Sequence, residues 1–158
     1  MDAFSVRTKI MIGGGMDALA QRLHRVFLVT DKFMAESGKT NYVTDRLLRS
    51  GGEFKIFSDV QADPDIATVT RGVEQILEFQ PDAVAFGGGS AIDAAKAIVF
   101  FAARERDMRD CKFIAIPTTS GTGSEGSRFA VITDQEKGVK YPLVEDSLLP
   151  DIAILDAE

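Results

Sequence analysis

Residues 85–102 read "AFGGGSAIDAAKAIVFFA", and the three consecutive glycines 87–89 join an apolar run to a helical pattern. Glycine has no Cβ, so the backbone there adopts positive φ freely and a ligand can touch the main chain. Ser90 is placed to cap the helix, and Asp93 completes the spacing of a capping box. The amides and the dipole at a helix start favour an anion. We therefore predict a phosphate or dinucleotide cradle, the alternative being a tight strand-to-helix turn without a ligand.

The sequence on either side of this junction alternates apolar runs with helical patterns. Buried strands are predicted at 26–30, 53–57, 82–86 and 112–116, and helices at 31–50, 66–79 and 91–103. Such alternation is typical of βαβ units and predicts an α/β, Rossmann-like, mostly parallel sheet flanked by helices. A C-terminal β-hairpin is predicted from 129–133 and 139–144, and further strands at 8–12 and 152–155.

Composition narrows the class of protein. The 158 residues suffice for one domain with a core, and 45% hydrophobic with 27% charged residues is typical of a soluble globular protein. The net charge of −6 disfavours a nucleic-acid surface, and no apolar run reaches the roughly 20 residues that cross a bilayer. The lone Cys111 excludes an internal disulfide and favours a cytosolic location. The lone His24, which we interpret as an ordinary surface or helix-end histidine, excludes a metal site built mainly from imidazoles.

Polar residues follow other predicted strands and are expected to face the same crevice. Asp31 ends the run 26–30, where its carboxylate either accepts both ribose hydroxyls of an adenosine and repels a 2′-phosphate, or caps the next helix. The loop "PTTSGTGSE", residues 117–125, carries five hydroxyls suited to ribose and phosphate. Lys140 on the predicted hairpin either reaches a phosphate or ribose, or is a solvated lysine.

Together these segments resemble the iron-containing (group III) alcohol dehydrogenase family. The resemblance rests on "VTDKF" (29–33), "GGGSAIDAAKAI" (87–98), "IPTTSGTGSE" (116–125), "VITDQEKGVKYPL" (131–143) and "LLPDIAILDAE" (148–158). It covers almost the whole chain, and the chain looks most similar to the alcohol dehydrogenases of propanediol or ethanolamine breakdown. One departure is that the family commonly continues "GSE" with Val-Thr, whereas this chain has Gly126, Ser127 and Arg128.

The resemblance implies that residues 1–158 are the dinucleotide-binding domain of an NAD(P)-dependent enzyme that interconverts alcohols and aldehydes by hydride transfer. NAD is favoured over NADP. In this family a second, helical domain holds iron or zinc through one aspartate and three histidines downstream of "ILDAE", and the metal polarises the substrate oxygen. We therefore expect the helical metal-binding domain to be absent here, with no catalytic or metal-ligating residue in this chain and no turnover by it alone.

Carried over by position, the cofactor-binding residues are Asp31, Asp63, Gly87, Gly88, Gly89, Ser90, Asp93, Thr118, Thr119, Thr122 and Lys140. The resemblance places the glycines, Ser90 and Asp93 at the pyrophosphate, Asp31 at the adenosine ribose, and Lys140 near the nicotinamide ribose.

The expected partners are a small alcohol or aldehyde substrate and further copies of the chain, with no nucleic acid and no membrane. A homo-oligomer is expected because a face without its helical domain would expose apolar surface. The cytosol is the expected location, a bacterial microcompartment being the alternative. Two other readings stay open: a stand-alone nucleotide-binding or interaction module without catalysis, and a glycerol dehydrogenase-like relative.

Overall fold

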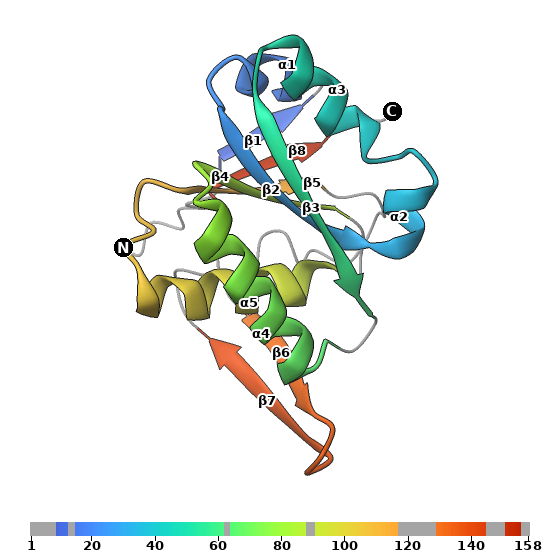
Figure 1. Ribbon diagram of the computed structural model, residues 1–158, viewed down its shortest axis with the longest axis vertical. Helices are drawn as coiled ribbons and strands as arrows, with labels where there is room; N and C mark the ends of the chain where they lie inside the picture. Colours follow the sequence, from blue (N-terminus) through green and yellow to red (C-terminus); the bar gives the residue numbers. More distant parts are fainter. Residues whose placement is uncertain are drawn as a thin grey trace, which may run out of the picture.

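The computed structural model describes residues 9–12, 15–61, 64–87, 91–116, 129–144 and 151–155. Within them, six strands form one parallel sheet (Figure 1). In spatial order these are β1 (Lys9–Ile12), β8 (Ile152–Leu155), β5 (Lys112–Ile116), β4 (Ala83–Gly87), β2 (Arg25–Asp31) and β3 (Glu53–Val60). A separate antiparallel hairpin pairs β6 (Phe129–Asp134) with β7 (Val139–Val144). The predicted α/β fold with a C-terminal hairpin is confirmed.

Helices cover both faces of this sheet (Figure 1). They are α1 (Gly15–Ala20), α2 (Lys32–Glu36), α3 (Asn41–Arg49), α4 (Ile66–Phe79) and α5 (Ala91–Glu105). Alternate side chains of β2 enter two cores, because successive residues of a strand point to opposite faces. Phe27 and Val29 pack with α4 and α5, whereas Val26 and Leu28 pack with α1 and α3.

The order of the strands creates a switch point between β2 and β4. From β2 the chain passes to β3 on one side, and from β4 it passes to β5 on the other. In open α/β sheets, ligands bind outside the carboxyl ends of the strands at such a point. A ligand site is therefore expected at the carboxyl ends of β2 and β4.

The predicted single helix over 31–50 is wrong, because two helices occupy this segment. α2 ends at Glu36, and a turn over residues 37–40 precedes α3. Gly38 lies in that turn with φ +82°, a left-handed conformation that interrupts a right-handed helix and suits glycine. The short helix α1 was not predicted, since its six residues carry too little periodicity to be read.

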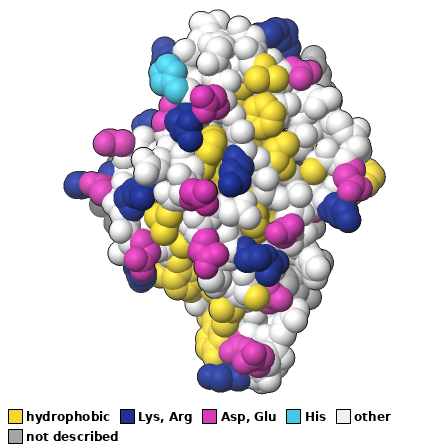
Figure 2. Space-filling model, in the orientation of Figure 1, with side chains coloured by type: hydrophobic (Ala, Val, Ile, Leu, Met, Phe, Trp, Pro, Cys, Tyr) yellow, Lys and Arg dark blue, Asp and Glu magenta, His cyan; other side chains and the backbone are white. Residues whose placement is uncertain are grey.

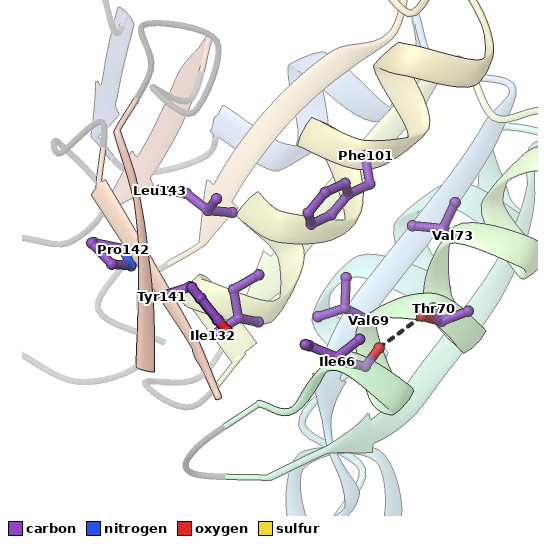
Figure 3. A pocket seen from close by; sticks show the side chains of 9 residues that line it. All are labelled: Ile66, Val69, Thr70, Val73, Phe101, Ile132, Tyr141, Pro142 and Leu143. Atoms are coloured by element: carbon purple, nitrogen blue, oxygen red, sulfur yellow. Dashed lines mark hydrogen bonds between the residues drawn. The ribbon is translucent and has the colours of Figure 1, made fainter. Parts of the chain in front are cut away.

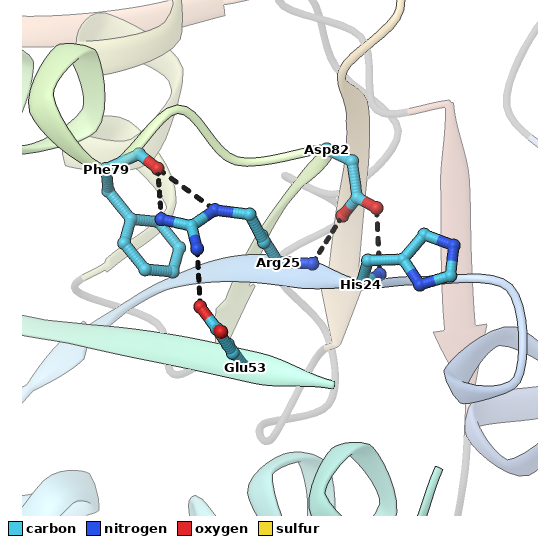
Figure 4. A network of polar contacts seen from close by, with 5 residues as sticks. All are labelled: His24, Arg25, Glu53, Phe79 and Asp82. Carbon is cyan, nitrogen blue, oxygen red and sulfur yellow. Dashed lines mark hydrogen bonds and ion pairs between the residues drawn. The ribbon is translucent and has the colours of Figure 1, made fainter. Parts of the chain in front are cut away.

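A polar network holds the amino ends of β2, β3 and β4 together (Figure 4). The Asp82 carboxylate accepts hydrogen bonds from the backbone N–H of His24 and of Arg25, over 2.8 and 3.0 Å. The Arg25 guanidinium donates to the carbonyl of Phe79, lies 4.2 Å from the centre of its ring, and pairs with Glu53. This edge is opposite to the carboxyl ends of the strands, so the network stabilises the sheet at a distance from the switch point.

Charged side chains of both signs are interspersed over the face drawn in Figure 2, with hydrophobic side chains between them. Large hydrophobic side chains exposed to solvent include Phe33, Leu48 and Tyr141. Among the helices that the structure describes, none combines the length and apolar character that crossing a membrane requires.

Candidate functional site

The carboxyl ends of β2 and β4 are joined by a side-chain hydrogen bond. Val29 and Phe86 form the last registered pair between these strands. One residue further on, the Thr30 hydroxyl donates to the carbonyl oxygen of Gly87 over 3.2 Å. Asp31 directly follows the donor, so the structure brings two predicted site residues, Asp31 and Gly87, to one edge of the sheet.

Asp31 caps α2. Its backbone is extended, with φ −90° and ψ 169°, and its Oδ1 accepts a hydrogen bond from the N–H of Met34 over 2.7 Å. Of the two interpretations left open by the sequence, the structure shows the capping one. A carboxylate has about four acceptor positions, so one backbone bond leaves capacity for hydroxyl donors. Ribose binding by Asp31 stays a prediction that the geometry permits.

The predicted glycine junction has the expected flanks. β4 ends at Gly87, which is buried, and α5 begins at Ala91. A helix of 15 residues presents the positive end of its dipole at its first turn, and this favours an anion beside the switch point. The structure thus shows the strand before the junction and the helix after it, while the ligand at the junction stays a prediction.

Asp93, in the first turn of α5, contacts the hairpin. Burial raises the pKa of its carboxyl, and this rise is opposed by a hydrogen bond with the backbone of Val131 on β6 and by the charge of Lys96. Ser90, the expected partner of Asp93 in a capping box, lies outside the described residues. Among the described residues, Asp93 therefore lies against β6, and its place at a pyrophosphate stays a prediction.

The hairpin is also attached to the segment between β3 and α4. The N–H of Thr133 on β6 donates to the carbonyl of Pro64 over 3.0 Å, and Thr133 forms a parallel bridge with Asp65. Across the hairpin, Thr133 stands in register with Lys140, whose side chain is exposed. Thr133 therefore lies between Lys140 and Asp65, and a shared site for Lys140 and Asp63 stays a prediction.

Several predicted site residues lie outside the described residues and stay predictions: Asp63, Gly88, Gly89, Ser90, Thr118, Thr119 and Thr122. The structure in turn adds Thr30, which sequence reasoning missed. Its side chain is 1% exposed and links two strand ends. The available signal was a hydroxyl residue closing the otherwise apolar run "VFLVT" at 26–30.

An apolar cavity of about 510 Å³ lies between α4, α5 and the hairpin (Figure 3). Its lining residues are Ile66, Val69, Thr70, Val73, Phe101, Ile132, Tyr141, Pro142 and Leu143. The Thr70 hydroxyl donates within its own helix, to the carbonyl of Ile66 over 2.8 Å. No lining residue carries a formal charge at neutral pH, so this cavity does not suit a pyrophosphate, and none of the predicted site residues lines it.

A metal centre does not fit the residues that the structure describes. No three histidine, cysteine, aspartate or glutamate side chains gather among them in a way that would hold a metal ion. His24 is exposed at the amino edge of the sheet, in agreement with its interpretation as an ordinary surface histidine.

Comparison with known proteins identifies the family. Residues 8–157 match the family described as iron-containing alcohol dehydrogenase. The chain is 44% identical over 159 residues to the 1-propanol dehydrogenase PduQ of Citrobacter freundii, an alignment that covers 99% of this chain and 42% of that protein.

Two solved structures share the fold. A 1,3-propanediol oxidoreductase matches with a TM-score of 0.85 at 28% identity, covering 99% of this chain and 46% of that one. The sulfoacetaldehyde reductase of Bifidobacterium kashiwanohense, solved in complex with NAD+, matches with a TM-score of 0.83 at 30% identity over the same shares.

The chain therefore belongs to the iron-containing alcohol dehydrogenase family, and the resemblance stated from its motifs is confirmed. It spans less than half the length of these relatives.

Proposed function

We propose that residues 1–158 form the NAD(H)-binding domain of an alcohol dehydrogenase that interconverts small alcohols and aldehydes. The observation that carries the proposal is the position of Gly87, the first glycine of the run, at the switch point where the ends of β2 and β4 lie side by side. Support comes from the family match over residues 8–157 and from the relative solved with NAD+.

The residues present suit a dinucleotide. Gly87 has no side chain to separate a ligand from the main chain, and the first turn of α5 favours the charge of a pyrophosphate. Asp31 offers a partly exposed carboxylate to ribose hydroxyls, one residue from the Thr30–Gly87 bond. We place the pyrophosphate at Gly87–Ser90, the adenosine ribose at Asp31 and the nicotinamide ribose near Lys140. When bound, the nicotinamide would supply hydride transfer, and this chain would hold and orient it.

The preference for NAD over NADP follows from Asp31. A 2′-phosphate carries negative charge, and a carboxylate at the same position repels it. Thr118, Thr119, Thr122 and Asp63 complete the proposed cofactor-binding set by sequence position. We propose no catalytic or metal-ligating residue in this chain, and iron or zinc belongs to the full-length enzyme.

Titration of the 158-residue chain with NADH tests the proposal. Bound nicotinamide is shielded from water, so we expect a change in NADH fluorescence that saturates, together with no alcohol-dependent reduction of NAD+ by this chain alone. A folded chain that shows no change up to millimolar NADH would overturn the proposal. The same titration with ADP-ribose, which competes for the ribose and pyrophosphate positions, is expected to displace NADH.

Two alternatives make different predictions. A stand-alone nucleotide-binding module would bind NADH as part of a product that lacks dehydrogenase activity at its natural length. A glycerol dehydrogenase-like relative would bind NADH and, at natural length, oxidise glycerol in preference to simple primary alcohols. Assaying the natural gene product with 1-propanol and glycerol separates these alternatives from the proposal.

Self-association forms the last part of the proposal. The exposed side chains of Phe33, Leu48 and Tyr141 provide apolar surface for contact between copies. Light scattering across a concentration series measures the mass directly, and a constant monomer mass would contradict this part alone. The cytosolic location proposed from the single cysteine is tested by fractionation of the source cells.

A further inference from the structure

Thr30 occupies a position where the backbone pairing of β2 is interrupted. On the β3 side, Val29 pairs with Phe57, but Asp31 pairs with Val60, so β3 carries an extra residue opposite this point. Such a bulge disrupts the ladder locally and re-aims the neighbouring side chains. On the β4 side, the registered pairs end at Val29 and Phe86. The β2–β4 ladder therefore stops one residue before Thr30, while on the β3 side the pairing resumes at Asp31 after the bulge.

The hydroxyl of Thr30 supplies the missing connection. It donates to the carbonyl of Gly87 over 3.2 Å, and the Thr30 side chain is only 1% exposed. Water cannot easily replace a partner at so buried a position, and an acceptor left without one is costly. This side-chain bond thus ties the last residue of β4 to β2 one residue beyond the end of their ladder.

We propose that Thr30 is a positioning residue that sets the spacing between two parts of the cofactor site. Asp31, the next residue, presents the carboxylate assigned to the adenosine ribose, and Gly87 begins the main chain assigned to the pyrophosphate. A dinucleotide reaches both positions only when their separation matches its own length, and pre-organising this separation increases affinity. The proposal rests on the proposed function, because it gives Thr30 a role at the same site.

Two substitutions separate the hydroxyl from the shape of the side chain. Thr30→Val keeps the β-branched shape and removes the donor, whereas Thr30→Ser keeps the donor and removes a methyl group. Thr44→Val is the matched control, since Thr44 is another buried threonine, 5% exposed, on α3. Affinity for NADH is measured by fluorescence and affinity for ADP-ribose by competition, with the melting temperature recorded for each variant.

Because Thr30→Val loses one buried hydrogen bond, we expect it to lower the affinity of the chain for NADH and for ADP-ribose about threefold to tenfold. Because both ligands contain the ribose and pyrophosphate, the two losses should be equal. Thr30→Ser and Thr44→Val should each stay within about twofold of the wild type. Unchanged affinity in Thr30→Val would overturn the proposal, and so would an equal loss in Thr30→Ser, because the hydroxyl would then not be responsible.

Failure of the proposed function has a different signature, namely a folded wild-type chain that binds neither NADH nor ADP-ribose. If Thr30→Val does not fold, hydrogen exchange of the wild-type chain decides the question. ADP-ribose should slow exchange in residues 29–31 and 84–87 together, because one bond couples them. Slowing in one segment without the other would overturn the positioning role.

Discussion

Replacing Asp82 with alanine tests the account of how the amino edge of the sheet is stabilised. The substitution removes two acceptors, one for the N–H of His24 at 2.8 Å and one for the N–H of Arg25 at 3.0 Å (Figure 4). The backbone bonds of residue 82 to Arg25 and Lys112 survive, because they do not involve the side chain. The strands should therefore stay paired, and the change should appear as a loss of stability alone.

The size of that loss follows from the exposure of the two bonds. A hydrogen bond to a charged group contributes roughly 1.5–3 kcal/mol, and the Arg25 bond is partly buried, so we assign it about 1.5 kcal/mol. The His24 bond is exposed, so water replaces the carboxylate and the loss is about 0.5 kcal/mol. The sum of about 2 kcal/mol should lower the melting temperature of a chain of this size by roughly 4–8 °C.

Thermal unfolding followed by far-ultraviolet circular dichroism measures this change. Asp82→Asn keeps one carbonyl oxygen as an acceptor, so about half of the loss is expected. Asp110→Ala is the control, because Asp110 is exposed in the turn before β5, and it should change the melting temperature by no more than about 2 °C. If Asp82→Ala melts within about 1 °C of the wild type, the reasoning about this edge is refuted.

Three further predictions concern single residues. Asp31→Asn removes the charge but keeps a good capping residue, so the melting temperature should stay unchanged while the NADPH-to-NADH affinity ratio rises about tenfold; equal weakening of both cofactors would reject the ribose role. The raised pKa of Asp93 means that the folded chain binds a proton more tightly than the unfolded chain, so this group's contribution to stability falls as pH rises from its ordinary value of 3.8 through the folded value. Asp93→Asn should therefore have a higher free energy of unfolding in urea than the wild type at pH 7, and this difference should disappear below about pH 4. A variant that is less stable than the wild type at pH 7 would contradict the expected direction of the effect. Burial is the main cause that raises the pKa of the Cys111 thiol to about 12, and the charges of neighbouring aspartates add to it. Ellman's reagent at pH 8 should therefore react at least about a hundredfold more slowly with the native chain than with the guanidinium-unfolded chain. Similar reaction rates for the two states would contradict this.

Local patterns predicted the elements that carry strong periodicity or continuous apolar runs. The helix predicted over 66–79 has these bounds in the structure, where Asp65 caps its start and Gln80 ends it in a left-handed conformation. The strand predicted over 112–116 is likewise found as β5. Parallel strands buried on both faces require unbroken apolar runs, and this requirement is visible in a single sequence.

Prediction failed where the decisive feature was short or conformational. The turn around Gly38 divides the segment 31–50 although its helical spacing continues on both sides. An aspartate at the end of a strand can serve either as a helix cap or as a ribose-binding residue. The 2.7 Å hydrogen bond from the N–H of Met34 to Asp31 is visible only in the folded structure.

The alternation of strands and helices, the glycines between β4 and α5, and the family could all be predicted from the sequence, because each depends on residues that are neighbours in the chain. The folded chain was needed to show that β2 lies beside β4 and that Thr30 bonds to Gly87, a residue 57 positions away. It was also needed to show that Asp93 lies against β6. Strand order, bulges and helix docking depend on which buried surfaces pack together over the whole chain, and no local spacing encodes that choice.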